Sequence, residues 1–409
     1  MKILVVIGDY LLENSSANLC HLSYLRGLVE NGHDTTLICA DSKGRPADPN
    51  MSIPRGIQYY SYQGLSLYEK LSIKYRRKDD VPHVDNSQEM TPKENTSLLK
   101  GAVRRMKSCV LHCYGPHGVY AAIVKTASRF SSSERFDCLV SLASPPASHL
   151  IAHNLIQSGR VKADSWIQIW EDPWTTDAYG FSNRKAVFRE EKRLLAYADR
   201  VCYVSPITLE NQKKLFPESA NKMYWVPVPS YYEVEETGDT LSSHAALFGY
   251  FGDYHLPARD LRPFYHAAKT TGIDVNICGD SNLSLSATEK IRVFPRLPLS
   301  KLRPIEEKTG VLVFLCNKAG GQIPGKIYQY AASRKTILFI LDGTEDERKT
   351  MKDFFEPFHR FVFCENKAES IERAIRAICN GELEAVQNEP LTQFKPKTIV
   401  QQLLSEGMK

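Results

Sequence analysis

The sequence has no run of about 18 consecutive apolar residues, which is the length that a membrane-spanning helix requires. Its first apolar stretch, Ile3 to Ile7, is followed by Asp9 and Glu13 and is too short for a secretion signal. Any membrane contact would therefore be peripheral. The 10 cysteines form no Cys-x-x-Cys pair, which is typical of free thiols in a reducing compartment. We expect a cytoplasmic protein, with the inner face of the membrane as a further place of action.

The chain carries little net charge for its size, with 52 Lys and Arg residues against 47 Asp and Glu residues. The resulting charge of +5 is too mild for a dedicated nucleic-acid binder, but it is compatible with phosphorylated ligands. The 409 residues, 43% of them hydrophobic, have ordinary globular composition and exceed one typical hydrophobic core. We therefore expect two domains and no nucleic-acid partner.

Strand and helix patterns alternate through the first half of the chain. A buried strand over residues 2–8, a helix ending at Gly32 and a strand over residues 35–40 would begin a parallel, doubly wound sheet, whose ligands lie beyond the carboxyl ends of the strands. We predict a Rossmann-like domain over residues 1–229, with an irregular, proline-containing insertion over residues 41–118. The other elements expected here are strands over residues 137–142, 166–170 and 201–205 and a helix over residues 190–197.

Residues 230–245 are polar and acidic without apolar periodicity, which is typical of an inter-domain linker. A second alternating series predicts a Rossmann-like domain over residues 246–390, and a helix within residues 391–409 is expected to pack back on the first domain. The fold class is therefore α/β, with two doubly wound, Rossmann-like domains. Strands of the second domain are expected over residues 247–251, 275–278, 311–316, 336–341 and 360–364.

The most informative segment runs from Val311 to Ile340 and has the pattern of buried strand, glycine-containing loop, helix and buried strand. Pro324 suits the first turn of a helix, where free backbone amides and Lys326 would form an anion site suited to a diphosphate. An ordinary strand–loop–helix unit with a solvated lysine would have the same pattern.

Residues 321–338 of this segment resemble the donor-binding segment of glycosyltransferase family 4, in which a glycine-bearing loop leads to a Pro-x-Lys helix start. The resemblance implies a GT-B fold, in which the two domains face each other across a cleft. It also assigns Gly325 and Lys326 to the diphosphate of a nucleotide-sugar donor. Members of the family commonly have two glutamates seven residues apart, and Gly321 and Gln329 occupy these positions here. Gln329 would then bind the ribose hydroxyls without a negative charge.

A second resemblance, to family-4 enzymes of bacterial surface-polysaccharide assembly, covers residues 136–174. It includes a Ser-Pro-Pro loop followed by His149, and an Asp-Pro-Trp motif that begins at Asp172. The resemblance implies a cleft-facing, catalytic role for His149 and Asp172. A helix-capping or surface histidine, and core packing of Trp174, are the plain alternatives. Glu171 stands where the family usually has an arginine.

Further donor contacts are expected at the strand ends of the second domain. Arg259 is the best candidate for the basic residue that reaches the diphosphate in the family, although it could be a solvated arginine at a helix start. Residues 293–298 resemble the turn that reads the nucleotide base, which places Arg296 and Leu297 at the base edge. A plain turn at the end of a strand is the alternative.

No metal site is expected. The chain has no Asp-x-Asp motif, which chelates the metal in the other major glycosyltransferase architecture. Cysteine and histidine side chains that could bind a soft metal ion occur close together at Cys109, His112, Cys113 and His117. Their spacing matches no standard zinc site. Basic runs at residues 76–78 and 104–107 could touch anionic lipid or lie on a solvated face. We expect no cofactor, because the nucleotide sugar is a substrate.

The sequence thus predicts a glycosyltransferase that moves a sugar from a nucleotide-diphosphate sugar to a glycan or lipid-linked acceptor in polysaccharide biosynthesis. The resemblance implies retention of anomeric configuration and a metal-independent hexosyltransferase type of reaction. A sugar-nucleotide epimerase of the same architecture would need acid–base side chains, which Glu171, Asp172 and His149 could supply. A non-catalytic nucleotide-sugar-binding subunit would agree with Gly321 and Gln329.

Overall fold

The structure is a computed structural model of the 409-residue chain. It describes all residues except 43, 46, 65–114, 177–183, 236–246, 320, 383–385 and 407–409. The basic runs at residues 76–78 and 104–107, and Cys109, His112 and Cys113, lie outside the described residues.

The first half of the chain forms a sheet of seven parallel strands in the order β3-β2-β1-β5-β7-β8-β9. Its central strand β1 (Lys2–Val6) pairs with β2 on one side and β5 on the other, so that Ile3 lies opposite Thr35 and Cys138. The central strands are buried and mostly apolar, with Ser141 of β5 and Gln168 of β7 as buried polar exceptions, because helices cover both faces of a parallel sheet. The other strands of this sheet are β2 (Asp34–Ala40), β3 (Gln58–Tyr62), β5 (Cys138–Ala143), β7 (Trp166–Trp170), β8 (Arg200–Tyr203) and β9 (Met223–Trp225), and a small separate pair consists of β4 (Arg135–Phe136) and β6 (Lys162–Ala163).

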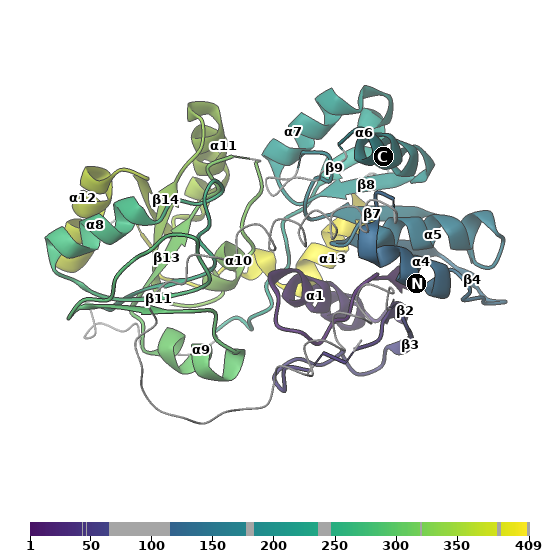
Figure 1. Ribbon diagram of the computed structural model, residues 1–409, viewed down its shortest axis with the longest axis horizontal. Coiled ribbons are helices and arrows are strands. Elements are labelled where there is room, and N and C mark those ends of the chain that lie inside the picture. The colour runs from purple at the N-terminus through teal and green to yellow at the C-terminus, as the bar shows by residue number, and fades with distance from the viewer. Residues whose placement is uncertain are drawn as a thin grey trace, which may run out of the picture.

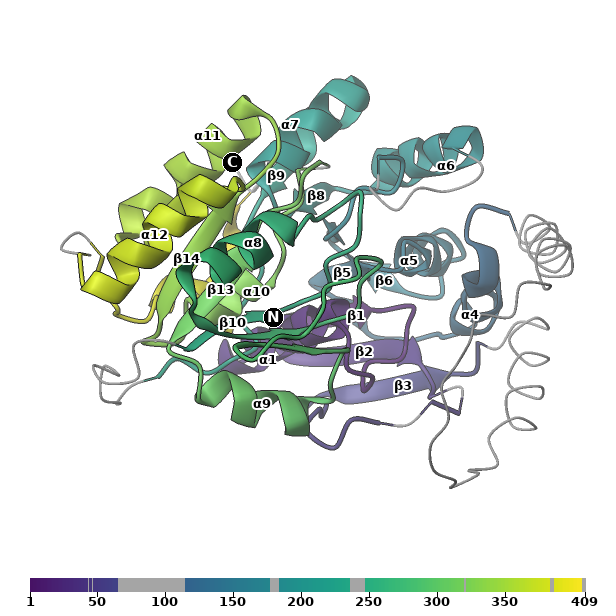
Figure 2. The ribbon, with the colours of Figure 1, turned by 60° about the vertical axis from the view of Figure 1, so that its left-hand side comes forward.

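The second half forms a sheet of six parallel strands in the order β12-β11-β10-β13-β14-β15. The chain order switches between β10 and β13, and crevices for ligands form at such a switch point. Figure 2 shows α8 and α12 side by side on one face of this sheet. The strands are β10 (Leu247–Phe251), β11 (Asp274–Cys278), β12 (Ile291–Phe294), β13 (Val311–Leu315), β14 (Thr336–Leu341) and β15 (Phe361–Glu365).

Local sequence signals explain where several helices begin. The Ser15 hydroxyl caps α1 by accepting a hydrogen bond from the Asn18 backbone, and Thr344 and Glu347 form a capping box at α11. The helices are α1 (Ser16–Glu30), α4 (Ala121–Ala127), α5 (Ala147–Gln157), α6 (Arg184–Tyr197), α7 (Pro206–Leu215), α8 (Arg262–Thr271), α9 (Leu299–Glu307), α10 (Lys326–Tyr330), α11 (Glu345–Phe355), α12 (Ala368–Asn380) and α13 (Pro396–Ser405), with short 3-10 turns at Gly118–Tyr120, Pro217–Lys222, Glu356–Phe358 and Thr392–Phe394.

The two sheets belong to two bodies that pack closely (Figure 1). One cluster of buried apolar residues runs from Leu25 of α1 to Ile327 of α10, so the domain seam is itself part of the core. The last helix, α13, returns to the first body and lies against α1, where a Cβ on Gly27 would come within 2.3 Å of the Pro396 carbonyl oxygen. Arg200 of β8 donates hydrogen bonds to the carbonyl oxygens of Leu404 and Glu406.

All ten strands predicted from the sequence are present, and the predicted helix at residues 190–197 is the second half of α6. One expectation needs correction, because residues 58–62 of the predicted irregular insertion form the edge strand β3. Most residues of β3 are exposed, so the strand has no buried apolar pattern by which it could be predicted. The division of the chain at residues 229, 245 and 390 stays a prediction.

Candidate functional site

A cavity of about 310 Å³, here called the interdomain cavity, lies between the two bodies. The carboxyl ends of parallel strands from both sheets line it, which is where open α/β sheets bind ligands. Glu171 and Asp172 follow β7, Gly252 and Asp253 follow β10, and Gly279 follows β11. Residues 323–326 and the first residues of α1 complete the lining.

Arg259 is held between two strand ends of the second sheet. Its Nε donates to Asn317 Oδ1 at 2.7 Å and its Nη1 donates to the Asp253 carbonyl oxygen at 2.9 Å. These bonds use two of the five N–H groups of the guanidinium and fix its orientation beside the interdomain cavity. Arg259 therefore has further donors for an anionic ligand, as its predicted role requires.

Lys326 also lines the interdomain cavity, but its ammonium already has partners. Its Nζ lies 3.7 Å from Glu306 Oε1, and it lies 5.4 Å from the centre of the Tyr232 ring. Burial would lower the pKa of Lys326, but Glu306 and Tyr232 outweigh this effect and raise it. The lysine is thus a charged group whose field is partly balanced by a buried carboxylate.

The helix at this position is shorter than the sequence pattern suggests. α10 begins at Lys326, Gly325 is its N-cap and Pro324 precedes it, so the expectation that Pro324 lies in the first turn is wrong. The helix contains only 5 residues, and the chain turns at residues 331–335 before β14. The backbone amides at Gly325 and Lys326 still lie at the start of a helix, where intrahelical acceptors are lacking.

Gln329 lies on α10 and its side chain is 4% exposed. It lines the interdomain cavity, and its Oε1 has no hydrogen-bond partner among the described residues. A buried carbonyl oxygen without a donor is unfavourable, which indicates that a ligand or water supplies one. The position and the free acceptor agree with the predicted contact to ribose hydroxyls.

Arg296 and Leu297 line the interdomain cavity beyond β12. The backbone N–H of Arg296 donates to Asp280 Oδ1 at 3.0 Å, and its guanidinium forms an ion pair with Asp253. Because that amide is already engaged, Leu297 is the better placed of the two for backbone contact with a base. The same network holds Asp253 Oδ1 against the amide of Asp280 at 2.9 Å.

The opposite wall of the cavity is acidic. Glu171, which replaces the arginine of the resembled family, lies 3.5 Å from Nε2 of the buried His21 on α1. Asp172 Oδ1 accepts a hydrogen bond of 2.6 Å from Gln322 Nε2 of the second body. Glu171 therefore contacts the first helix, while Asp172 reaches across the cavity.

The structure contradicts the prediction that His149 faces the cleft. His149 lies in the first turn of α5, is fully buried and is absent from the lining of the interdomain cavity. Its Nδ1 is 2.7 Å from Ser141 Oγ, and its ring packs 4.3 Å from that of Trp170. Burial, with a contribution from His117, lowers the pKa of His149 well below its usual range. His149 is thus a neutral core residue in this arrangement.

Several residues of the site could not be recognised from the sequence. Gln322 and Asn317 have only polar side chains in a loop, and Glu306 lies in an otherwise ordinary helix, α9. Gly321 stands at a position where the resembled family commonly has a glutamate. The structure explains it, because its φ is +70° and a Cβ would lie 2.5 Å from Ile207 of the first body. Any side chain at this position would press against α7.

Among the described residues, no helix is long and apolar enough to span a membrane. Within the same part of the chain, no group of three or more His, Cys, Asp and Glu side chains could hold a metal ion. The one described member of the group considered for zinc, His117, pairs with Glu190 at 3.1 Å and packs against Trp174. Trp174 is itself buried, as expected for core packing.

Comparison with solved structures finds this fold in other proteins. Sucrose-phosphate synthase from Thermosynechococcus elongatus has a TM-score of 0.53 and 11% identity, with 98% of this chain and 95% of that chain covered. A glycosyltransferase from Rickettsia africae has a TM-score of 0.49 and 11% identity, with 99% of each chain covered. No protein-family model and no curated protein matches the sequence. The first likeness and the two parallel sheets confirm the predicted α/β GT-B fold with two Rossmann-like domains.

Proposed function

We propose that this chain is a glycosyltransferase that takes a sugar from a nucleoside-diphosphate sugar bound in the interdomain cavity. The observation that carries the proposal is the opposite charge of the two cavity walls. Arg259 and Lys326 lie on the wall of the second domain, and Glu171 and Asp172 lie on the wall of the first. A diphosphate is attracted to the cations, whereas sugar hydroxyls can donate hydrogen bonds to the carboxylates.

The proposed donor contacts follow from these positions. Arg259 and the amides at Gly325 and Lys326 bind the diphosphate, Gln329 binds the ribose hydroxyls, and Arg296 and Leu297 lie at the base. Asp172 contacts the reacting sugars from the acceptor domain. Since His149 is buried in the core, it has no part in this proposal.

The chemistry requires charge stabilisation where the donor breaks. The bond between the anomeric carbon and the phosphate oxygen is cleaved, and negative charge accumulates on the nucleoside diphosphate. Fixed N–H groups of Arg259 and of the start of α10 stabilise that charge. We propose transfer with retention, in which the departing phosphate oxygen takes the proton of the attacking acceptor hydroxyl. No step requires a metal ion.

We further propose a glycan or lipid-linked acceptor, peripheral membrane contact on the cytoplasmic side and a role in polysaccharide biosynthesis. The support for these finer points is the resemblance of the Ser144–Pro146 and Asp172–Trp174 motifs to enzymes of surface-polysaccharide assembly.

Product analysis tests the proposal. The full chain is incubated in chelator with a panel of uridine, guanosine, adenosine and cytidine diphosphate sugars and with glycan acceptors. Free nucleoside diphosphate together with a glycosylated acceptor is the expected result. An epimerised nucleotide sugar would favour the epimerase, for which the carboxylates of Glu171, Asp172 and Asp253 line the cavity as acid–base groups. Donor binding without turnover would favour a non-catalytic subunit.

A further inference from the structure

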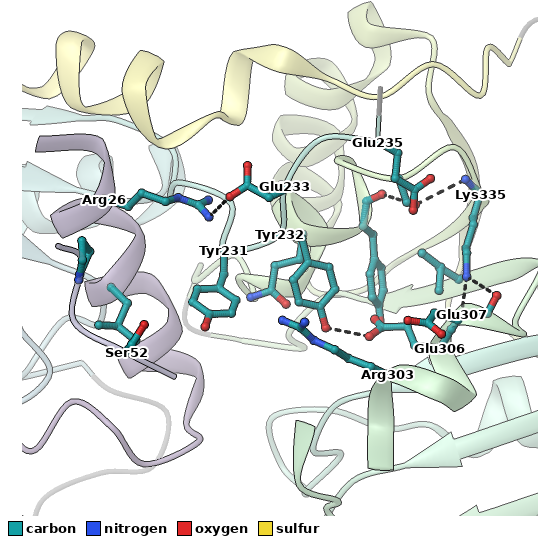
Figure 3. A pocket seen from close by; sticks show the side chains of 16 residues that line it. Arg26, Ser52, Tyr231, Tyr232, Glu233, Glu235, Arg303, Glu306, Glu307 and Lys335 are labelled. Atoms are coloured by element: carbon teal, nitrogen blue, oxygen red, sulfur yellow. Dashed lines mark hydrogen bonds and ion pairs between the residues drawn. The ribbon is translucent and has the colours of Figure 1, made fainter. Parts of the chain in front are cut away.

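A second cavity of about 480 Å³ lies along the same domain seam (Figure 3). The first residues of α1 and α9 line the interdomain cavity, whereas Arg26 of α1 and Arg303 and Glu306 of α9, farther along these helices, line the second cavity. Tyr231 and Tyr232 lie between the two domains in this view. Gln329 lines both cavities, so they are adjacent but distinct.

The charges of the second cavity disfavour an anionic ligand. Its lining includes three cationic side chains and four acidic ones. Arg26 forms an ion pair with Glu233, and Lys335 Nζ donates to the carbonyl oxygens of Glu306 and Glu307 at the end of α9. The third cation, Arg303, lies over the ring of Tyr232, 5.6 Å from its centre. Because all three cations have partners and the acids are in excess, a phosphate or sulfate has no favourable place here.

Two buried acceptor atoms at this cavity lack donors. Glu306 is 6% exposed and Gln329 is 4% exposed, and neither Glu306 Oε1 nor Gln329 Oε1 has a hydrogen-bond partner among the described residues. The other carboxylate oxygen, Glu306 Oε2, accepts from the Tyr232 hydroxyl at 2.7 Å. Lys326 Nζ lies 3.7 Å from Oε1, which is an ion-pair distance beyond a hydrogen bond. The fitting ligand is therefore rich in hydrogen-bond donors.

The aromatic side chains narrow the class of ligand. The rings of Tyr231 and Tyr232 have centroids 6.4 Å apart and are inclined by 56°. They form a corner rather than the parallel-sided slot in which a flat nucleobase stacks. A saccharide ring fits such a corner, because its C–H groups pack against the negative face of an aromatic ring and its hydroxyls point outward.

We propose that the second cavity is a binding site for a neutral mono- or disaccharide. Its hydroxyls donate hydrogen bonds to Glu306 Oε1 and to one of the two lone pairs of Gln329 Oε1. Its apolar face packs against the ring of Tyr231, because Arg303 and Lys326 already lie over the ring of Tyr232. The site extends beyond the proposed function, since it requires no nucleotide.

The position of the site has a consequence for the first cavity. Arg26 and Ser52 come from the first domain and Glu306 and Gln329 from the second, so an occupant contacts both. Such a ligand favours the present arrangement of the domains. Gln329 and the Lys326–Glu306 pair connect the two cavities, and binding in each should therefore change affinity in the other by the same factor.

The test titrates nucleotide-free full chain with glucose, galactose, mannose, N-acetylglucosamine, maltose, cellobiose and lactose by calorimetry. We expect at least one of them to bind, with affinity about tenfold lower in Tyr231→Ala, which removes the aromatic face. Ser52→Trp, which fills the cavity from the first domain, should abolish binding. Tyr59→Ala, on the exposed edge strand β3, is the matched control for loss of a tyrosine, and Arg259→Ala should bind the sugar as the wild type does.

Three results would overturn the inference. The first is that no saccharide binds. The second is that Arg259→Ala weakens saccharide binding while Tyr231→Ala and Ser52→Trp leave it unchanged. The third is that a free nucleoside binds in place of the saccharides and that Tyr231→Ala abolishes this binding. Failure of the proposed transferase function would leave these titrations unchanged. The two proposals are therefore tested separately.

Discussion

The side-chain amide of Gln322 donates a hydrogen bond of 2.6 Å to Asp172 Oδ1, from the loop before α10 to the opposite domain. The same loop is held a second time, since the hydroxyls of Ser205 and Thr208 both donate to the carbonyl oxygen of Gly321. The loop that leads to the proposed diphosphate contacts is thus positioned by the first domain. Binding of the proposed donor should therefore depend on contacts that lie outside the second domain.

Gln322→Glu should weaken donor binding more than Gln322→Ala. The alanine removes one hydrogen bond, worth about 0.5–1.5 kcal/mol, and should reduce nucleoside-diphosphate affinity by no more than about tenfold. The glutamate places a second carboxylate against Asp172, so repulsion adds to the loss. Calorimetry gives the affinities, and small-angle scattering should show a larger radius of gyration for the glutamate variant. Equal affinities for both variants would contradict this account of the contact.

Gly321→Ala should be more harmful than Gly159→Ala. Both glycines have left-handed φ values, +70° and +69°, but a Cβ would lie 2.5 Å from Ile207 at Gly321 and has open space at Gly159. The control should lose about 1 kcal/mol of unfolding free energy through backbone strain alone. Gly321→Ala should lose more and should also weaken diphosphate binding, because the loop is pushed off α7. Urea denaturation with a parallel diphosphate titration measures both, and matching losses would refute the docking argument.

Arg259→Ala should reduce affinity for nucleoside diphosphates by a charge-assisted bond of about 1.5–3 kcal/mol, or roughly 10- to 150-fold. Affinity for the free nucleoside should barely change. Arg262→Ala is the matched control, because Arg262 is exposed, pairs with Asp260 and does not line the interdomain cavity. Lys326→Ala should have a smaller effect than Arg259→Ala, since Glu306 already balances its charge. A stronger effect of Lys326 would reverse the order of importance of the two cations.

The fold could be predicted largely because buried parallel strands are predominantly apolar, with glycine or proline nearby. Segments such as Trp166–Trp170 and Thr336–Leu341 coincide with the predicted strands residue for residue. Gln58–Tyr62 could not be predicted, because an exposed edge strand shows no burial pattern. The length of α10 could not be predicted, because its apolar residues continue into turns that are buried by tertiary packing.

The site could be predicted only in part, since sequence position fixes which strand end a residue follows but not where its side chain points. Arg259, Lys326 and Gln329 meet in one cavity because they follow neighbouring strands. His149 follows a strand of the first sheet in the same way, but it points into the core toward Ser141 and Trp170. The pairing of Lys326 with Glu306 joins residues 20 positions apart and has no sequence signal.

Gln329→Ala should weaken binding of nucleotide and nucleotide sugar alike, by roughly threefold to tenfold, the value of one neutral hydrogen bond. The reason is that the variant lacks Oε1, the atom that would accept a hydrogen bond from a ribose hydroxyl. Titration of ribose and 2′,3′-dideoxyribose nucleotides into both proteins separates this contact from general destabilisation. Equal affinity of the wild type for the two nucleotides would show that Gln329 does not bind the ribose hydroxyls.

Glu191 should make the stability of the protein fall as pH rises toward neutrality. It is fully buried on α6, and its Oε2 accepts hydrogen bonds from the backbone and the hydroxyl of Thr175, just beyond the Asp172–Trp174 motif. Burial raises the pKa of Glu191 from its usual 4.5 to about 7, although the hydrogen bonds from Thr175 oppose the rise. Folding therefore favours the protonated acid. This contribution to stability is complete below pH 4.5 and is lost as pH rises through about 7.

The neutral isostere Glu191→Gln isolates this contribution, because its amide oxygen can still accept a bond from Thr175 and does not titrate. As the pH rises from 4.5 to 7, the wild type should lose up to about 3 kcal/mol of unfolding free energy relative to Glu191→Gln. Thr175→Val removes the hydroxyl bond that lowers the pKa, so in this variant the decline should continue to higher pH. Urea denaturation across this range gives the three curves. Parallel curves for wild type and Glu191→Gln would mean that folding does not raise the pKa of Glu191. Groups other than Thr175 would then also offset the effect of burial on this pKa.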